Sequence, residues 1–474
     1  MRRISIDTLG MTSPRGTSFK AAKRRRSPWC ISRPRLVTTC CLFAVLYLYL
    51  NYGRTPILIP TDSYELLKDD SLTDILNSTL GFQKILVLNL PYRTDRRDAM
   101  TLAAATSNMK LEFVDGVTGD SIRNSAYPPP EENIRLPVGI RGSWRTHMNA
   151  LQRVVNQNLT TALIFEDDVD WDIRLRPNLQ RFALASRFLS ENHGILTSPK
   201  YPLDHRPNPE TPETSFHILS DNGITQELPS LPLSSVYQKP LRYPRQEPNT
   251  LTSPYGDPSQ WDILWIGHCG VGFPRYSSEH AKTDITTANV LITHPNDQSV
   301  PSKKWLKAHP FQGDLDPLAA AYPPHTRVYH RASGGELCTV GYAVSQRGAR
   351  RLLHQFGIKA WNGIFDSELG RWCAGEDPQT DAESTASKEN RKQNPLVGKT
   401  GKGTSRGGTE RVCLTSQPPI FAHHHPMDGE SDIGGLGGGY ANKYETKYLR
   451  YSVRMNLERI VQGVKDLVDQ WPDE

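Results

Sequence analysis

Cysteine is scarce in this sequence of 474 residues, and its spacing excludes a common class of metal site. None of the 7 cysteines is separated from another by two residues, so the C-x-x-C spacing of zinc sites is absent. Three lie in or beside an amino-terminal apolar run: Cys30, Cys40 and Cys41. The remaining four are Cys269, Cys338, Cys373 and Cys413. These four allow three disulfide pairings, and the sequence does not choose among them.

Acidic residues are nearly absent from residues 1–35, where Lys and Arg are frequent. Most of the net charge of +6 therefore arises at this end of the chain. A local asymmetry of this kind does not indicate a nucleic-acid-binding surface on the folded part. We expect no nucleic-acid partner.

No apolar run reaches the roughly 20 residues that a helix needs to span an average bilayer. Residues 36–50 are nevertheless uncharged, and two polar residues after them can lie at the membrane interface. Tyr and Asn stand where a signal-peptide cleavage site needs small residues, and the basic residues before the run keep that side cytoplasmic. We expect a signal-anchor transmembrane helix over 36–52. Residues 1–35 would be its cytoplasmic tail, and the remainder would lie in the lumen of the secretory pathway, with the Golgi favoured.

The alternative to an anchor is a buried core helix behind a basic tract of the nuclear-import type. The sequons at Asn77 and Asn158 distinguish the two, because both would be open to glycosylation in the lumen. Residues 53–83 then read as a stem between the membrane and the folded domain.

Apolar runs alternating with helical patterns indicate an α/β fold. Lys84–Leu90 is a continuous apolar run, as expected for a parallel strand buried on both faces, and a helical pattern follows it. A second short run, Leu111–Val114, closes at a turn. Helical spacing over Gly139–Val155 leads to the strand Ala162–Phe165. The order strand, helix, strand is the opening of an α/β sheet.

Further elements are predicted in the second half of the chain. Trp261–Ile266 and Leu337–Val344 are predicted strands. Ser345 can cap a helix that Gly357 would end. Leu449–Val468 has the pattern of an amphipathic helix, so residues 441–474 are expected to form a helical extension that packs on the domain or leads away from it.

Two stretches have no sustained periodicity and are interpreted as insertions in a domain spanning 84–440. Residues 194–260 are rich in proline, and residues 374–409 consist mainly of Lys, Gly, Ser, Thr and acids. Gly398-Lys399-Thr400 and the glycine run 434–439 resemble phosphate-binding loops. Neither has the strand, turn and helix around it that such loops require, so both are discounted.

An acidic triplet, Glu166, Asp167 and Asp168, ends the strand Ala162–Phe165. Adjacent carboxylates repel one another, and a carboxylate beside a buried strand is desolvated unless a positive group lies against it. A divalent cation such as Mg²⁺ or Mn²⁺, with phosphate oxygens, would be such a partner. The alternative is a solvated surface turn. Asp170 and Asp172, just beyond, are expected to be ordinary solvated acids.

A basic turn ends the first strand and contains Arg93, Asp95, Arg96 and Arg97. Ligands of open α/β sheets lie outside the carboxyl ends of strands, so the basic turn and the acidic triplet are expected to face one crevice. The arginine fork donates to two phosphoryl oxygens at once, which suits a diphosphate. The alternative is a solvated helix start.

Two further groups of residues are candidates for a general base and for metal ligands. Asp366 and Glu368, after the predicted helix, are candidates for a general base, although a surface position is the commoner fate of an acid. One of three consecutive histidines could complete a metal shell, or all three could lie in a loop: His423, His424 and His425.

Several blocks, in chain order, resemble glycosyltransferase family 25, a group of lipopolysaccharide-biosynthesis and collagen galactosyltransferase-like enzymes. The blocks are Ile85–Arg97, Phe113–Gly116, Gly139–His147, Leu163–Val169, Trp261–Gly267, Gly341–Leu353 and Ser431–Ile433. In the third block Ser143 stands where Cys is usual and Thr146 where Ser is usual. The two insertions also depart from the family pattern, which makes the placement of Asp366 and of the histidines less secure.

The resemblance implies a GT-A-like nucleotide-diphospho-sugar transferase fold and inverting transfer from a nucleotide sugar, UDP-galactose or UDP-glucose, to a glycan or glycoprotein acceptor. It implies a divalent metal, Mn²⁺ favoured, held by the acidic triplet, with Asp168 as the first ligand and Glu166 beside it. From the histidine run, His424 is our candidate for a further ligand. The implied nucleotide-sugar side consists of Asn89, Arg93, Asp95, Arg97, Asp115, His147, Glu166 and Asp167. The base is assigned to Asp366 and Glu368. The rival is a non-catalytic sugar- or partner-binding module that retains the fold.

Overall fold

The computed structural model describes residues 70–191, 215–221, 224–237, 253–271, 290–306, 316–332, 336–376, 411–425, 432–433 and 445–473. The chain divides into two units, Met1–Asp62 and Ser63–Glu474, and all described residues belong to the second. The predicted tail and the predicted transmembrane helix over 36–52 lie outside the described residues. Within the described ranges, no helix has the length and apolar character needed to cross a membrane.

The three strands from the amino-terminal part of the domain are parallel, as predicted. Strand β1 (Lys84–Asn89) lies between β2 (Leu111–Asp115) and β3 (Thr161–Glu166) and pairs in parallel with both. Helices α3 (Thr94–Thr106) and α4 (Val138–Asn156) connect these strands. Because parallel strands end at one edge, Asn89, Asp115 and Glu166 finish side by side.

The strands from the later part of the chain make the sheet mixed. The strand order is β2-β1-β3-β10-β7-β11-β9-β8-β6-β5, and β10 pairs antiparallel with both β3 and β7. The bounds of the added strands are β10 (Gly341–Ser345), β7 (Ile263–Gly267), β11 (Cys413–Gln417), β9 (Arg327–Arg331), β8 (Leu291–His294), β6 (Ile224–Pro232) and β5 (Ser215–Asp221). A mixed sheet with helices on its faces is consistent with the GT-A-like fold that we expected.

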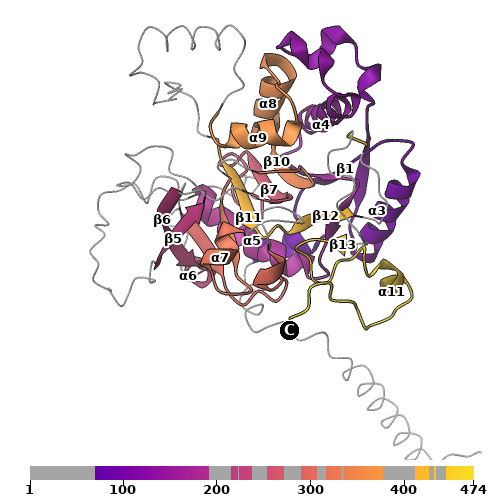
Figure 1. Cartoon of the computed structure of the whole chain (residues 1–474). Coiled ribbons are helices and arrows are strands. Elements are labelled where there is room, and N and C mark those ends of the chain that lie inside the picture. The colour runs from indigo at the N-terminus through magenta and orange to yellow at the C-terminus, as the bar shows by residue number, and fades with distance from the viewer. Residues whose placement is uncertain are drawn as a thin grey trace, which may run out of the picture. The chain divides into compact units, whose positions relative to one another are not determined.

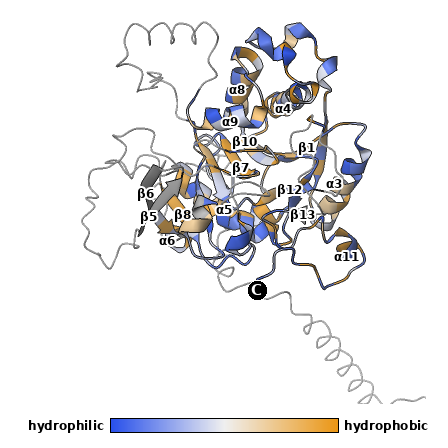
Figure 2. Ribbon diagram, in the orientation of Figure 1, coloured by the Kyte–Doolittle hydropathy of each residue, from blue (hydrophilic) through white to orange (hydrophobic). Residues whose placement is uncertain are grey.

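Helices cover both faces of the sheet, and the strand alternation decides which side chains meet them. Leu163 and Phe165 of β3 join a core with residues of α3 and α5 (Leu175–Glu191). Ala162 and Ile164 join a second core with α4, α8 (Gln346–His354) and α9 (Phe365–Cys373). Figure 1 shows α4, α8 and α9 on one side of the strands, and Figure 2 shows the apolar strands between the layers.

The predicted cap at Ser345 is confirmed. Its Oγ accepts a hydrogen bond from the backbone N–H of Gly348 at 3.0 Å, which satisfies a free donor in the first turn of α8. Glycine is required at 348, since a Cβ there would lie 2.1 Å from the carbonyl oxygen of Asp262. The helix continues beyond the predicted end at Gly357 as the π-helix η8 (Gln355–Lys359).

Two predicted boundaries differ from the structure. Part of the proline-rich stretch 194–260 forms β5, β6 and α6 (Leu233–Tyr237), and β6 pairs in parallel with β8. Strand pairing with a distant segment, rather than local periodicity, defines these elements. The last part of the predicted stem also belongs to the domain, because Leu72 and Ile75, in the 3₁₀ helix η1 (Asp70–Leu76), are buried in the core.

Short elements complete the described chain. They are η2 (Gly119–Ser121), η3 (Asn124–Ala126), η4 (Glu131–Arg135), η7 (Lys303–Trp305), α7 (Pro317–Ala321), β4 (Val169–Trp171), β12 (Phe421–His425), β13 (Glu445–Thr446) and α11 (Leu457–Val461). Strand β12 pairs with β4, with β13 and with the end of β7. The two glycine-containing stretches that we discounted lie outside the described residues.

The four cysteines after residue 52 form two disulfides, Cys269–Cys338 and Cys373–Cys413. The first joins the loop after β7 to the segment before β10, next to the edge where β1 and β3 end. The second joins the end of α9 to the start of β11, at the opposite edge. Tertiary structure therefore selects one of the three possible pairings.

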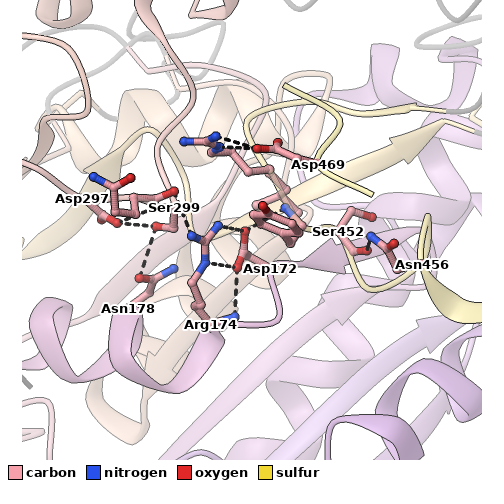
Figure 3. A network of polar contacts seen from close by, with 12 residues as sticks. Asp172, Arg174, Asn178, Asp297, Ser299, Ser452, Asn456 and Asp469 are labelled. Atoms are coloured by element: carbon pink, nitrogen blue, oxygen red, sulfur yellow. Dashed lines mark hydrogen bonds and ion pairs between the residues drawn. The ribbon is translucent and has the colours of Figure 1, made fainter. Parts of the chain in front are cut away.

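The carboxyl-terminal segment is not the extended helix that we predicted. Among residues 445–473 only Leu457–Val461 is helical, and the segment bonds to the end of β4, since the backbone N–H of Val453 donates to the carbonyl of Trp171. The prediction that Asp170 and Asp172 are solvated is wrong, because they are 0% and 1% exposed. Asp172 receives two hydrogen bonds from Arg174, at 2.8 Å each, and one from the backbone N–H of Tyr451 at 3.0 Å (Figure 3).

Asp170 fixes the same segment to the sheet. Its Oδ2 accepts hydrogen bonds from the hydroxyl of Thr446, at 2.6 Å, and from that of Ser452, while the backbone N–H of Trp171 donates to Oδ1 at 2.7 Å. A buried carboxylate is tolerated where several donors satisfy it. The two acids beyond the triplet thus have a structural role that sequence pattern did not indicate.

We predict that Asp170→Ala lowers the free energy of unfolding by about 3 kcal/mol, because it leaves buried donors without an acceptor. Equilibrium urea unfolding measures this loss. Asp466→Ala removes an exposed acid of the same segment and is the matched control, with an expected change within about 0.5 kcal/mol. Equal effects of the two substitutions would contradict the role of Asp170.

Candidate functional site

The acidic triplet lies at the edge of the sheet where β1, β2 and β3 end. Residue Glu166 is the last residue of β3, and its backbone N–H donates to the carbonyl of Val340 at 3.1 Å, just before β10. The start of β10 and the end of β7 also meet at this edge, since Gly341 is the partner of both Phe165 and Gly267. Segments far apart in the chain therefore surround the triplet.

The basic turn faces the triplet, as predicted. The guanidinium of Arg96 contacts Asp167 at 2.7 Å and Asp168 at 2.8 Å, and Asn89 Nδ2 donates to Asp167 Oδ2 at 2.8 Å. Burial, followed by the charge of Asp168, raises the pKa of Asp167. The interpretation of the triplet as a solvated surface turn is excluded, because Asp167 is only 7% exposed.

Asp168 has a guanidinium and an imidazole against one of its two oxygens. Its Oδ2 lies 2.8 Å from Arg96 and 2.8 Å from His423 Nε2. Burial opposes the charge of this carboxyl, but His423 and Arg96 outweigh it and hold its pKa below the ordinary value. Its Oδ1 is buried and has no hydrogen-bond partner among the described residues, and the same is true of Asn89 Oδ1.

A third cationic side chain binds the backbone of the triplet. Arg454, from the carboxyl-terminal segment, donates to the carbonyl oxygen of Asp167 at 2.7 Å and to that of Val169 at 2.8 Å. Its guanidinium thus binds the backbone on either side of Asp168. The segment that we predicted as a helical extension in fact completes the charge balance of the site.

The histidine run lies on β12, and strand alternation separates its members. His423, rather than the predicted His424, contacts Asp168, and His425 lies on the same side as His423, with ring centroids 4.2 Å apart. His424 contacts Thr446 Oγ1 at 2.9 Å and lies 3.9 Å from Asp170. Burial and then the charge of Arg454 lower the pKa of His424 to about 3, so this ring is neutral.

Glu166, the first residue of the triplet, contacts a chain of buried polar side chains. Its Oε1 accepts a hydrogen bond from Thr339 Oγ1 at 2.6 Å and lies 3.5 Å from His147 Nε2. The other ring nitrogen of His147 contacts the hydroxyl of Tyr342 at 2.9 Å, and the ring stacks on Phe365. At 1% exposure His147 has no access to a nucleotide, so the structure makes it a support for Glu166.

The two candidate bases have different surroundings, because residues two apart on a helix face different directions. At the start of α9, Asp366 accepts a hydrogen bond from the backbone N–H of Cys338 at 2.7 Å, and burial and Glu166 raise its pKa. Asp366 therefore lies within the electrostatic reach of the site. Glu368 pairs with Arg371 at 3.0 Å, and burial raises its pKa without any influence from the triplet.

The remaining predicted residues lie around the rim. Arg93 binds Asp95, with contacts at 2.9 and 2.8 Å, and also pairs with Asp432 of the predicted closing block. The hydrogen bond from Arg93 lowers the pKa of Asp95 to about 2. The guanidinium of Arg97 lies 3.9 Å from Asp115 and 4.3 Å from the centroid of a phenylalanine ring.

Sequence reasoning missed several residues of the site. They are Thr339, Tyr342, Lys447, Tyr448 and Arg454, of which Lys447 and Tyr448 line a small cavity together with His423 and His425. Tyr342 lies in the family-like block Gly341–Leu353 and Thr339 just before it, whereas the other three lie in a segment without a motif. Contacts across the sheet bring all five here. Within the described part of the chain, no group of three or more His, Cys, Asp or Glu side chains is arranged to hold a metal ion.

Residues 82–235 match the family model described as glycosyltransferase family 25 (LPS biosynthesis protein). Human inactive glycosyltransferase 25 family member 3 is 30% identical over 115 residues, which are 22% of this chain and 19% of the relative. Mouse procollagen galactosyltransferase 2 is 26% identical over 113 residues, or 22% and 18% of the two chains.

Procollagen galactosyltransferase 1-A of Xenopus laevis is 25% identical over 112 residues, which are 21% of this chain and 18% of the relative. The chain thus spans about a fifth of the length of these curated relatives. The family-model match covers β1, α3, β2, α4 and β3, and thus the basic turn and the acidic triplet, but not β10, β12 or the carboxyl-terminal segment. Residues 82–235 of this chain are thus similar in sequence to glycosyltransferase family 25.

Proposed function

We propose that this protein is a glycosyltransferase that moves a hexose, with galactose favoured, from a UDP-sugar to an acceptor hydroxyl with inversion. The observation that carries the proposal is Asp168, a largely buried carboxylate at the edge where Asn89 and Arg96 converge. One of its oxygens has no hydrogen-bond partner among the described residues. Galactose is favoured because two of the relatives are named galactosyltransferases. Procollagen, the protein in their names, is the first acceptor to test.

A divalent cation, with Mn²⁺ favoured, fits the donor set at this edge. Asp168 Oδ1 and Asn89 Oδ1 are buried oxygens without hydrogen-bond partners among the described residues, and hard cations take such oxygens as ligands. Asp168 would be the main ligand, with Glu166 close by, and His423 replaces His424 as the nearest imidazole. A cation here would neutralise the negative charge of the departing nucleotide.

The protein's own groups have separable tasks. We assign Arg93 and Arg97, on the rim, to the phosphoryl oxygens, whereas Arg96 and Arg454 hold the triplet in one geometry. Asp366 is proposed as the base that takes the proton of the acceptor hydroxyl, because burial raises its pKa toward the working range of such a base. Glu368, bound to Arg371, is not retained in this role.

One specific observation favours a second function, a sugar- or partner-binding module without catalysis. Asp168 Oδ2 is already neutralised by Arg96 and His423, so the described groups balance its charge without a metal. The human relative, moreover, is named inactive. Binding of a UDP-sugar without turnover would support this alternative.

We predict that Asp168→Asn lowers UDP release from UDP-galactose, measured with Mn²⁺ and procollagen, by roughly 10²- to 10³-fold. The amide keeps the shape of the side chain but removes the charge that holds a cation. Asp98→Asn, an exposed acid of α3, is the matched control and should keep full activity. Unchanged turnover in a folded Asp168→Asn protein would contradict the proposal that Asp168 takes part in catalysis.

We predict that Asp366→Asn lowers kcat by about 10²-fold or more while leaving the affinity for UDP-galactose unchanged, because only the proton acceptor is lost. Wild-type turnover should rise with pH through the raised pKa of Asp366, since the base acts when deprotonated. The variant should lose this rise. Glu376→Gln, an exposed acid just after α9, provides the control.

We also propose that the catalytic unit lies in the lumen of the secretory pathway, behind a single amino-terminal anchor. Two disulfides support this address, because such bonds persist in oxidising compartments. Asn77 and Asn158 are both exposed, as acceptors of glycan must be.

We predict that the protein isolated from eukaryotic cells carries N-linked glycan at Asn77 or Asn158. Treatment with an N-glycosidase should increase its electrophoretic mobility, and Asn77→Gln with Asn158→Gln should abolish that shift. A wild-type protein that shows no glycan at either position would contradict the luminal address.

A further inference from the structure

A second cavity, of about 280 Å³, lies between α8, α9 and the start of β11. Its described lining residues are Arg350, Arg351, His354, Gln355, Trp372 and Arg411. Three are arginines, and no acidic side chain is among them. Because a water molecule takes up about 30 Å³ of liquid, the cavity has room for more than a bare ion.

The cavity is separate from the acidic triplet. Arg411 precedes Cys413, which pairs with Ile263 at the start of β7, whereas the triplet lies near Gly267 at the end of β7. Figure 1 shows α8 and α9, both orange, against one face of the sheet. A ligand bound here would occupy the edge opposite the proposed donor site.

Two of the arginines are held in place around an indole. The guanidinium of Arg351 lies 5.3 Å from the Trp372 ring centroid and donates to Asp262 at 2.7 Å. That of Arg411 lies 4.9 Å from the same ring and donates to the carbonyl of Trp372 at 3.0 Å. Fixed guanidinium groups lose little freedom when they bind a ligand, which favours a preformed site.

Two other lining side chains have hydrogen-bond donors without a partner among the described residues. Gln355 is 5% exposed, and its Nε2 donor is buried without a hydrogen-bond partner among the described residues. A buried donor is costly to leave unpaired, so it indicates a missing acceptor. Arg350 is exposed, and within the described ranges its side chain has no hydrogen-bond or ion-pair partner.

We propose that this cavity binds the tetrahedral oxyanion of a sugar ester, either a phosphate or a sulfate. Guanidinium forks match the spacing of oxygens on such groups, and the amide of Gln355 supplies a neutral donor. The volume accommodates the sugar that carries the ester. Recognition of this anion is independent of the transfer reaction proposed above.

Isothermal titration calorimetry of the full-length protein, at constant ionic strength, tests the proposal with galactose 6-phosphate, galactose 6-sulfate, inorganic phosphate and unmodified galactose. At least one ester should bind, whereas unmodified galactose should not. The tighter ester identifies the source of the oxyanion. Saturating UDP should leave ester binding unchanged, because the donor edge is a different place.

Arg350→Gln and Gln355→Leu should each weaken ester binding about tenfold, the loss expected for one hydrogen bond to a charged group. Arg135→Gln removes an exposed arginine that does not line the cavity and is the matched control. UDP binding should be unchanged in all three variants. Absence of ester binding, displacement by UDP, or an equal loss in Arg135→Gln would overturn the proposal.

Discussion

Neutralisation of a buried acidic run is the constraint on which the site depends. Between Glu166 and Asp172, three carboxylates are buried and that of Asp168 is largely buried, and isolated charges in such surroundings would be very costly. Their donors come from distant parts of the chain: the turn after β1 for Asp167 and Asp168, the strand β12 for Asp168 also, and the carboxyl-terminal segment for Asp170 and Asp172. The acids thus hold this edge of the sheet together.

The same constraint explains why the carboxyl-terminal segment is part of the domain. Arg454 and Ser452 bind the backbone and side chains around the triplet, and Tyr451 and Arg174 enclose Asp172. An ordinary amphipathic helix would present only one apolar face to the sheet. Here short turns place successive polar groups against successive acids, and this requires an irregular backbone.

The two edges of the sheet carry clusters of opposite charge. At the edge where β1 and β3 end, carboxylates are clustered and cations neutralise them. At the opposite edge, arginines of α8 and of the segment before β11 surround Trp372 with no described acid in the cavity lining. A disulfide lies near each edge and ties a loop or helix end to the strands, so both sites rest on rigid elements.

Sequence by itself determined the parallel strands β1, β2 and β3, the helices α4 and α8, the Ser345 cap and the meeting of a basic turn with the acidic triplet. These features follow from local periodicity and from the rule that parallel strands end at one edge. Only the tertiary structure decided the disulfide pairing, the burial of Asp170, the choice of His423 over His424 and the roles of His147 and Arg454. Each of these depends on contacts between segments tens to hundreds of residues apart, and no local pattern encodes which side chain of a strand or turn will meet a distant partner.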